Sequence, residues 1–167
     1  MVINGWRLFF WSAFRERWQA IRDAARDARD ADPTGYALAP EVKFLRTVRD
    51  LVFKEIPANP DHPRFRQGKT LGPAHTHWRR AKFHRRFRLL FRFHTASRTI
   101  IYGWLNDETT LRKAGSRTDP YAVFRRMLER GAPPPDWDSL MWACDAASNQ
   151  GIDDASDLSR RPDSSPP

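Results

Sequence analysis

Basic side chains that could contact a polyanion gather in one stretch of this sequence. Between His62 and Asn106 the chain has 11 of its 29 Lys and Arg residues, all five of its histidines and none of its 20 acidic residues. The rest of the chain holds 18 basic and 20 acidic residues, so the net charge of +9 originates in this window. A local excess of positive charge indicates a binding surface for nucleic acid, an anionic membrane or an acidic protein.

The alternation of residue types within this window separates the basic side chains from the apolar ones. Successive side chains of a strand point to opposite faces of its sheet. From residue 86 to 94 one parity is mainly basic, namely Arg86, Arg88, Leu90, Arg92 and His94, and the other is apolar, namely Phe87, Leu89, Phe91 and Phe93. We expect the apolar set to pack on helices and the basic set to lie on the opposite face.

The segment before it, residues 78–84, predicts the partner strand of a hairpin. Arg80, Lys82 and His84 share a parity with Trp78. Pairing then brings Arg80, Lys82, Arg86 and Arg88 onto one face. Like charges opposite one another destabilise a sheet by roughly 0.2–1 kcal/mol per pair, so this arrangement favours a role in polyanion binding. Trp78, His84 and Trp104 would add rings on which unpaired RNA bases stack.

Other catalytic chemistry has weak support in the sequence. It contains no Gly-rich phosphate loop and no nucleophile–base pair at a telling spacing. His75 and His77 could bind a metal, but no third ligand is placed, so we interpret them as loop histidines. Asp107 and Glu108 follow the last predicted strand and are either a cap or turn or a pair of catalytic carboxylates. Cys144 is the only cysteine, which excludes an internal disulfide and fits a reducing cytoplasm.

The elements that position these residues predict one α+β domain over residues 1–148. Two amphipathic helices, one capped by Ser12 and running to about Asp30 and one from about Pro40 to Ile56, form a hairpin. The expected strands are 4–11, 78–84, 87–94 and 98–105, of which the last three form an antiparallel meander. Helices are expected from Asp119 to Gly131 and over 137–148, and a disordered tail over 149–167. Neither a membrane span nor a signal peptide is predicted.

Motifs spread over about residues 4–140 resemble the YhaV family of toxins from type II toxin–antitoxin systems. The matching stretches are Asn4-Gly5-Trp6, Asn59-Pro60, Phe65-Arg66, Gly68-Lys69, Leu71-Gly72, Lys82-Phe83, Arg86 to Arg92, Gly103-Trp104, Asn106-Asp107-Glu108, Thr110-Leu111-Arg112, Gly115, Thr118-Asp119, Tyr121, Val123-Phe124, Met127-Leu128, Arg130-Gly131 and Pro134 to Trp137.

The resemblance implies a RelE-like fold, in which a helix hairpin packs on one face of a small, mainly antiparallel sheet, with further helices at the C-terminus. It also implies a metal-independent endoribonuclease without a cofactor, which cuts mRNA at the ribosome and inhibits translation. In such enzymes the RNA 2′-hydroxyl attacks the adjacent phosphate and leaves a 2′,3′-cyclic phosphate. The alternative from the residues alone is a non-catalytic basic module that binds RNA or a partner.

The resemblance assigns roles to individual positions. Arg88 matches the phosphate-holding arginine of the superfamily, and Arg80 and Lys82 match a basic pair in which one member acts as base or stabilises the 2′-oxygen. Neighbouring arginines would lower the pKa of such a lysine. Asp107 and Glu108 are acid/base candidates, and Arg112 either pairs the phosphate or pairs Glu108. The expected RNA-binding residues are Lys69, Arg79, His84, Arg85, Arg86, Arg92 and Trp104, and no tyrosine matches the stacking tyrosine of some relatives.

The partners implied are an antitoxin resembling PrlF, with an AbrB-type DNA-binding fold, and mRNA on the ribosome. The antitoxin should lay an acidic segment over the basic face. Contact with promoter DNA is expected only through the antitoxin complex, and no membrane partner is expected. A cytoplasmic location is expected.

Overall fold

A computed structural model describes residues 1–147, and a five-stranded sheet lies at its centre. The strands, in spatial order, are β1 (Val2–Ile3), β2 (Trp6–Phe10), β5 (Thr99–Leu105), β4 (Phe87–His94) and β3 (Arg79–Phe83). Strands β2 and β5 are parallel, and the other neighbours are antiparallel. The expected α+β fold with a mainly antiparallel sheet is therefore confirmed.

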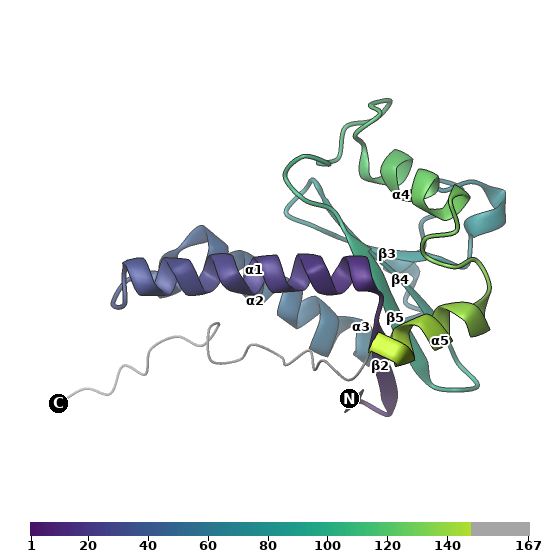
Figure 1. The fold of residues 1–167 in the computed structure, drawn as a ribbon, viewed down its shortest axis with the longest axis horizontal. Helices are drawn as coiled ribbons and strands as arrows, with labels where there is room; N and C mark the ends of the chain where they lie inside the picture. The colour runs from purple at the N-terminus through teal and green to yellow at the C-terminus, as the bar shows by residue number, and fades with distance from the viewer. Residues whose placement is uncertain (148–167) are drawn as a thin grey trace.

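The helices form two groups along the chain. The first comprises α1 (Ser12–Ala31), α2 (Pro40–Asp50), a π-helical turn η2 (Leu51–Glu55) and α3 (Ile56–Ala58), and the second comprises α4 (Pro120–Glu129) and α5 (Trp137–Ala147). Short 3-10 turns lie at η1 (Tyr36–Leu38), η3 (Pro63–Phe65) and η4 (Pro73–His75). In Figure 1 the paired helices α1 and α2 project to one side of the sheet. No helix within residues 1–147 has the length and apolar character needed to cross a bilayer.

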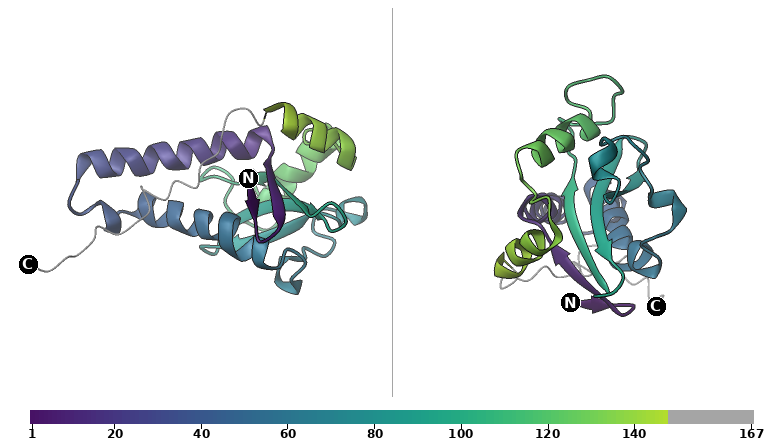
Figure 2. Two further views of the ribbon diagram at one scale, coloured as in Figure 1. Left: turned by 90° about the horizontal axis from the view of Figure 1, so that it is seen from below. Right: turned by 90° about the vertical axis from the view of Figure 1, so that its right-hand side faces the viewer.

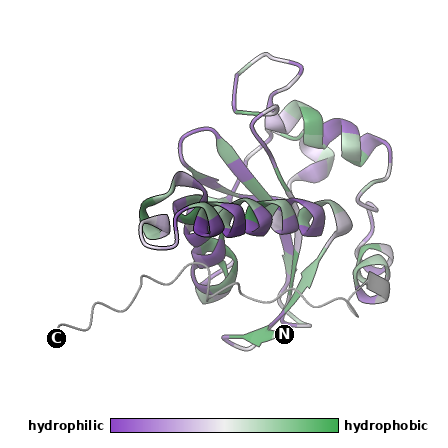
Figure 3. Cartoon of the chain, turned by 60° about the vertical axis from the view of Figure 1, so that its left-hand side comes forward, coloured by the Kyte–Doolittle hydropathy of each residue, from purple (hydrophilic) through white to green (hydrophobic). Residues whose placement is uncertain are grey.

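One face of the sheet packs on the α1–α2 hairpin, as the alternation predicted. The apolar parity of β4, including Leu89 and Phe91, belongs to a core with Ala81 and Phe83 of β3. From α1 this core receives Phe14, Trp18, Ile21 and Ala25, which lie at helical spacing. The remaining positions of α1 are largely polar, so hydrophilic and hydrophobic residues alternate along the helix in Figure 3.

The opposite face of the sheet has a second core, which the sequence did not predict. Trp78, Leu90 and Ile101 are fully buried there under Phe124 and Leu140 of the C-terminal helices. In the right-hand view of Figure 2 the sheet lies between these helices and those around α2. The basic parity of β4 is therefore covered along part of its length.

The ring of Trp78 lies directly on the backbone of β5. A Cβ atom at Gly103 would approach Trp78 Cζ3 within 2.6 Å, so a side chain is excluded there. At this point the register shifts, because Leu90 pairs with Trp104 and Phe91 with Tyr102, which leaves Gly103 as a bulge. Trp78 was expected to stack on RNA bases, and its complete burial shows that this expectation was wrong.

Several boundaries differ from the expected ones for local reasons. Asn4 and Gly5 have φ values of 50° and 77° and form a tight turn between β1 and β2, where one strand was expected. Asn-Gly is the strongest signal for such a turn. Ser12 is the first helical residue and Trp11 occupies the cap position, so the expected cap was wrong. The helix from Pro40 is confirmed and continues through η2 to Ala58, whereas residues 148–167, including the expected tail, lie outside the described residues.

Candidate nucleic-acid interface

A cluster of four basic residues lies where the β3–β4 hairpin meets the loop after β5. Lys82 pairs directly with Arg88 in the antiparallel register, and Arg80 is two residues from Lys82 on the same face of β3. The positive charges of Arg80, Arg88 and Arg112, together with partial desolvation, lower the pKa of Lys82, and Arg80 has the largest effect. Within residues 1–145 the Lys82 amine has no hydrogen bond or ion pair.

Arg88 is held firmly by acceptors of the protein itself. The residue is only 6% exposed. Its Nε donates to Tyr121 Oη at 3.1 Å, and its Nη1 donates to the carbonyl oxygens of Arg85 at 3.0 Å and Phe87 at 2.8 Å. None of the described residues accepts a hydrogen bond from Nη2, so the two N–H groups of that nitrogen are left for a ligand. A guanidinium presented in this way suits an anion such as phosphate.

Tyr121 at the start of α4 connects Arg88 to Arg112. Its ring centroid lies 5.9 Å from the Arg88 guanidinium carbon and 5.3 Å from that of Arg112. Arg112 also forms an ion pair with Asp119, the residue that caps α4 by accepting from the Tyr121 amide at 3.2 Å. The sequence pattern did not single out Tyr121 for the site. The available signal was the Asp119-Pro120 cap, which places the following residue in the first helical turn.

Asn106 connects the hairpin to the loop that carries Arg112. It is completely buried directly after β5. Its Oδ1 accepts from the Arg88 amide at 2.6 Å, and its Nδ2 donates to the carbonyl oxygens of Arg86 at 3.1 Å and Thr110 at 2.8 Å. Because one buried amide joins three segments, the backbone positions of Arg88 and of the Arg112 loop depend on each other.

The hairpin turn adopts an unusual backbone conformation at two residues that are not glycine. His84 and Arg85 have φ values of 42° and 61°, a region that costs roughly 1–2 kcal/mol for an ordinary residue. The His84 ring packs against Phe44 of α2 at 5.6 Å, and its Nε2 lies 3.2 Å from Thr47 Oγ1. The His84 side chain therefore lies on the face of the sheet that packs on the α1–α2 hairpin and not beside Lys82. The left-handed turn ends the alternation of the strand there.

The other basic residues of the turn lie near its surface. Arg85 and Arg86 are exposed, and the Arg86 Nε donates to the Arg112 carbonyl oxygen at 3.2 Å. Lys69 is also exposed, in the loop before η4. These three side chains are exposed and do not form part of the fixed geometry of the cluster.

The carboxylate of Asp107 organises a turn. Its Oδ1 accepts from the Thr109 amide at 2.9 Å and from the Thr110 hydroxyl at 2.9 Å. Desolvation raises the pKa of Asp107, but hydrogen bonds from Thr109 and Thr110 and the charge of Arg17 lower it by more. Of the two readings of this segment, the structure therefore gives Asp107 the turn geometry, and no helix follows it at residues 109–113.

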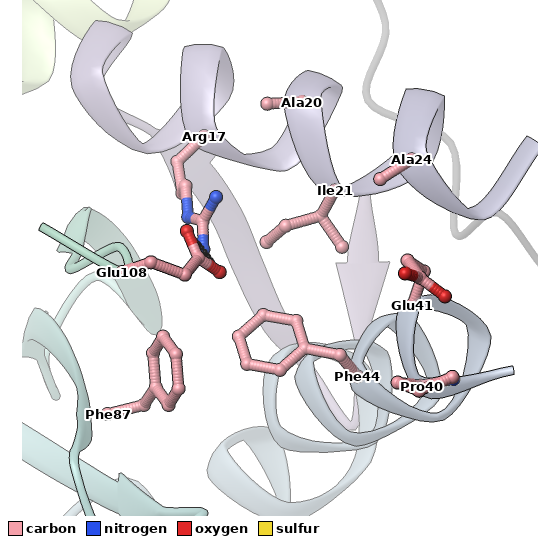
Figure 4. Close-up of a pocket in the computed structure, with 9 residues that line it drawn as sticks. All are labelled: Arg17, Ala20, Ile21, Ala24, Pro40, Glu41, Phe44, Phe87 and Glu108. Carbon is pink, nitrogen blue, oxygen red and sulfur yellow. Dashed lines mark hydrogen bonds and ion pairs between the residues drawn. The ribbon is translucent and has the colours of Figure 1, made fainter. Parts of the chain in front are cut away.

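Glu108 points to the opposite side of the sheet. It forms an ion pair with Arg17 of α1 at 3.1 Å and borders an apolar cavity of about 290 Å³, together with Phe44 and Phe87 (Figure 4). The expected alternative pairing of Arg112 with Glu108 was wrong, because Arg112 pairs with Asp119 and Glu108 with Arg17. The structure thus brings Arg80, Lys82, Arg88 and Arg112 together and separates Glu108 from them.

Three further residues expected to bind RNA are engaged within the protein. Arg79 pairs with Asp61 at 3.1 Å and stacks on Phe93, on the face of the sheet that packs on the α1–α2 hairpin. Arg92 donates to the Pro135 carbonyl oxygen at 3.0 Å and lies over the rings of Trp78 and Trp137. Trp104 stacks on Phe124 at a centroid distance of 5.8 Å and is half-buried.

The possibility of a histidine-based metal site gains no support from the geometry. The rings of His75 and His77 lie 6.2 Å apart in the loop around η4. Among the described residues no three His, Cys, Asp or Glu side chains gather as potential metal ligands.

A small α+β fold with a restrained arginine beside a lysine of lowered pKa has the features of a phosphodiester-binding protein. Residues 8–145 match the family model Toxin_YhaV, described as a toxin with endonuclease activity, of a toxin–antitoxin system. The chain therefore belongs to the YhaV toxin family, and its antitoxin is an expected partner.

Comparison with curated proteins gives relatives that carry the same family name. The chain is 41% identical over 140 residues to Toxin YhaV of a UPEC strain of Escherichia coli and to Ribonuclease toxin YhaV of the K-12 strain. Each alignment covers 83% of this chain and 91% of the relative. No solved structure matches the chain.

Proposed function

We propose that this toxin is an endoribonuclease that cuts mRNA by activating the RNA's own 2′-hydroxyl, without a metal ion. The observation that carries the proposal is the pairing of Arg88, whose Nη2 is left for a ligand, with the uncompensated amine of Lys82 across the β3–β4 hairpin. Attack of a 2′-hydroxyl on the adjacent phosphate needs a base for its proton and positive charge for the extra negative charge on the phosphate. Both requirements fit this pair.

In the proposed reaction Arg88 Nη2 donates to a non-bridging oxygen of the scissile phosphate. The neutral amine of Lys82 takes the 2′-hydroxyl proton as the 2′-oxygen bonds to phosphorus. The bond from phosphorus to the 5′-oxygen then breaks and the 5′-oxygen takes a proton from water, which leaves a 2′,3′-cyclic phosphate and a 5′-hydroxyl. Arg80 and Arg112 stabilise the negative charge that accumulates on the phosphate oxygens.

Carboxylates have less support as participants in this reaction. One carboxylate oxygen of Asp107 accepts hydrogen bonds within its own turn, and Glu108 pairs with Arg17 on the other side of the sheet. We assign Lys69, Arg85 and Arg86 to contacts with flanking RNA phosphates, because their side chains are basic and exposed. Contacts of this kind increase affinity and carry no sequence information.

The partner we propose is an antitoxin of the PrlF type that covers the basic cluster with an acidic segment. The excess of positive charge between His62 and Asn106 supports an acidic contact surface on the partner. Cleavage on the ribosome, promoter binding only through the antitoxin complex and a cytoplasmic location complete the proposal.

The test is to map RNA ends after the toxin is produced alone and together with its antitoxin. We expect growth arrest and discrete new mRNA ends that carry a 2′,3′-cyclic phosphate, with both suppressed by the antitoxin. The purified toxin should produce the same ends in EDTA, with and without ribosomes compared side by side. Soluble toxin that binds RNA but produces no such ends would instead support a non-catalytic RNA-binding module. Loss of cleavage in EDTA with rescue by one divalent ion would show a metal nuclease.

A further inference from the structure

A basic cavity of about 480 Å³ lies against the edge strand β3, on the far side of Arg80 and Lys82 from Arg88. Its lining includes four cationic residues, namely Arg64, Arg66, Arg80 and Lys82, and one carboxylate, Glu55. Glu55 is engaged by Arg64 at 2.9 Å. Within the described residues, Arg66, Arg80 and Lys82 have no ion pair. Arg66 and Arg80 therefore bring two uncompensated positive charges to the cavity, and Lys82 adds a third when its amine is protonated.

The segment that forms the outer wall of this cavity is anchored to the sheet. Phe65 in η3 is buried and packs edge-to-face on Phe91 of β4, with ring centroids 5.4 Å apart. Arg66 forms an antiparallel bridge with Arg79, so this segment lies along the otherwise open edge of β3. The bridge holds the backbone of Arg66 opposite Arg79, next to Arg80 in the strand, and the side chains of Arg66 and Arg80 both line the cavity at this edge.

Arg80 joins the cavity to the catalytic cluster. Its Nη1 donates to the Arg64 carbonyl oxygen at 3.4 Å, whereas its Nε is buried and has no hydrogen-bond partner within residues 1–145. Arg80 is also the residue with the largest effect on the pKa of Lys82. A buried N–H group without an acceptor is costly, so the described residues leave part of the hydrogen-bonding capacity of Arg80 unused.

We propose that this cavity is a second phosphate subsite, in which Arg66 and Arg80 bind the phosphodiester next to the scissile one. The inference rests on the proposed ribonuclease function and extends it. Lys82 and Arg80 line both sites, so one continuous polyanion can run from Arg88 across the β3 edge to Arg66. A backbone with a negative charge on every nucleotide fits this row of basic side chains, because proteins that bind single strands commonly use a positively charged groove that follows the backbone.

The test compares Arg66→Gln with Arg130→Gln, which removes an equal charge from an exposed position at the end of α4. The probe is an RNA oligonucleotide centred on a mapped cleavage site, with a 2′-deoxy nucleotide at that site so that it binds without being cut. We expect Arg66→Gln to weaken binding about tenfold, the size of one charge-assisted contact. The slope of log affinity against log salt should fall by about 0.7, the value for one phosphate contact in a single strand.

A neutral methylphosphonate, moved one linkage at a time along the probe, identifies the phosphate. At one linkage beside the cleavage site, the methylphosphonate should weaken binding to the wild type about tenfold, as Arg66→Gln does. The same methylphosphonate should have no effect on binding to Arg66→Gln. Arg66→Lys should recover part of the affinity, because it keeps the charge. With the cleavable all-ribose RNA at saturating concentration, the kcat of Arg66→Gln should remain close to that of the wild type.

Three results would overturn the subsite. Arg66→Gln could bind no differently from Arg130→Gln, or the methylphosphonate effect could persist unchanged in Arg66→Gln at every linkage. A loss of antitoxin affinity without loss of RNA affinity would assign the cavity to the protein partner. Circular dichroism and thermal melting show whether each variant is folded. In all three cases wild-type cleavage with cyclic phosphate ends would still support the ribonuclease proposal, so the two failures are distinguishable.

Discussion

Arg88 and Arg92 occupy the same face of β4, four residues apart, yet the protein surrounds them in opposite ways. Arg88 is held through Nε and Nη1 by a tyrosine and two carbonyl groups, and its Nη2 remains for a ligand. Arg92 lies between two indole rings and donates to the carbonyl oxygen of Pro135, in the link between α4 and α5. One arginine keeps N–H groups for the proposed RNA phosphate, and the other attaches the C-terminal layer to the sheet.

The difference between the two arginines comes from their neighbours on adjacent strands. The residue opposite Arg88 is Lys82 on β3, whereas the residue opposite Arg92 is Ile101 on β5, within the second core. Desolvation is the main influence on Arg92 and lowers its pKa, and the charge of Asp136 opposes that effect. The same residue type on one strand thus suits the proposed phosphate binding where charges are left uncompensated, and packing where aromatic rings cover it.

The largest effect should follow from Arg88→Lys. Lysine keeps the charge but cannot make the three directed hydrogen bonds that orient the guanidinium. We expect kcat to fall by about 100- to 1,000-fold, corresponding to roughly 2.7–4 kcal/mol of transition-state stabilisation. Cleavage of a defined RNA measures this, with thermal melting to show that the variant is folded. Activity within twofold of the wild type would remove Arg88 from the phosphate site.

Lys82→Arg tests the residue opposite Arg88 as a base. A lowered pKa gives Lys82 a larger neutral fraction at any given pH, so log kcat of the wild type should rise by about one per pH unit below that pKa. Arginine keeps the positive charge but cannot accept the proton. We expect at least a tenfold loss at pH 8 and a flat residual profile. A variant with the same rising profile as the wild type would show that another group is the base.

Tyr121→Phe removes one restraint on Arg88 and leaves the ring in place. The variant loses the 3.1 Å hydrogen bond from Arg88 Nε. We expect kcat to fall three- to tenfold, about the effect of one hydrogen bond to a charged group, with KM nearly unchanged. A matched Tyr102→Phe variant loses the 2.6 Å bond from its hydroxyl to the Val52 carbonyl oxygen in the other core, so it should lose stability and keep kcat. Equal effects on kcat would show that Tyr121 acts only through general stability.

The smallest effect on catalysis should come from Arg92→Met. Methionine keeps an apolar stem between Trp78 and Trp137 but loses the hydrogen bond to Pro135. We expect the free energy of unfolding to fall by about 1–3 kcal/mol, as measured with urea, while kcat below the melting transition stays within twofold. A tenfold loss of kcat in folded protein would mean that Arg92 contributes to RNA cleavage after all.

The alternation of residues 78–94 was sufficient to predict which side chains share a face. It put Lys82 and Arg88 on one face and assigned Leu89 and Phe91 to the core that packs on the α1–α2 hairpin, because a strand offers only two faces. His84 departed from this rule, since two consecutive residues with positive φ reverse the chain there. A turn without glycine gives the sequence no local signal for that change.

Contacts between distant segments were not predictable from the sequence. Tyr121 reaches Arg88 across 33 positions, and Glu108 reaches Arg17 across 91. Charge pattern near each residue suggested different partners, such as the i+4 pairing of Glu108 with Arg112. The second core was missed for the same reason. The apolar residues around Trp78 and around Phe124 give no indication in the sequence that the two side chains pack on each other.

The parallel pairing of β2 with β5 sets an order for folding. Arg7 pairs with Thr99, 92 positions later, whereas β3, β4 and β5 pair through short connections. Local pairings form faster than distant ones, because less chain entropy is lost when the loop closes. The strands that carry Lys82 and Arg88 can therefore assemble early and bring their like charges together. Two segments must then dock to hold these charges in place, namely β2 with α1 from one end of the chain and α4 with Tyr121 from the other. The arrangement of Lys82, Arg88 and Tyr121 is therefore completed late in folding.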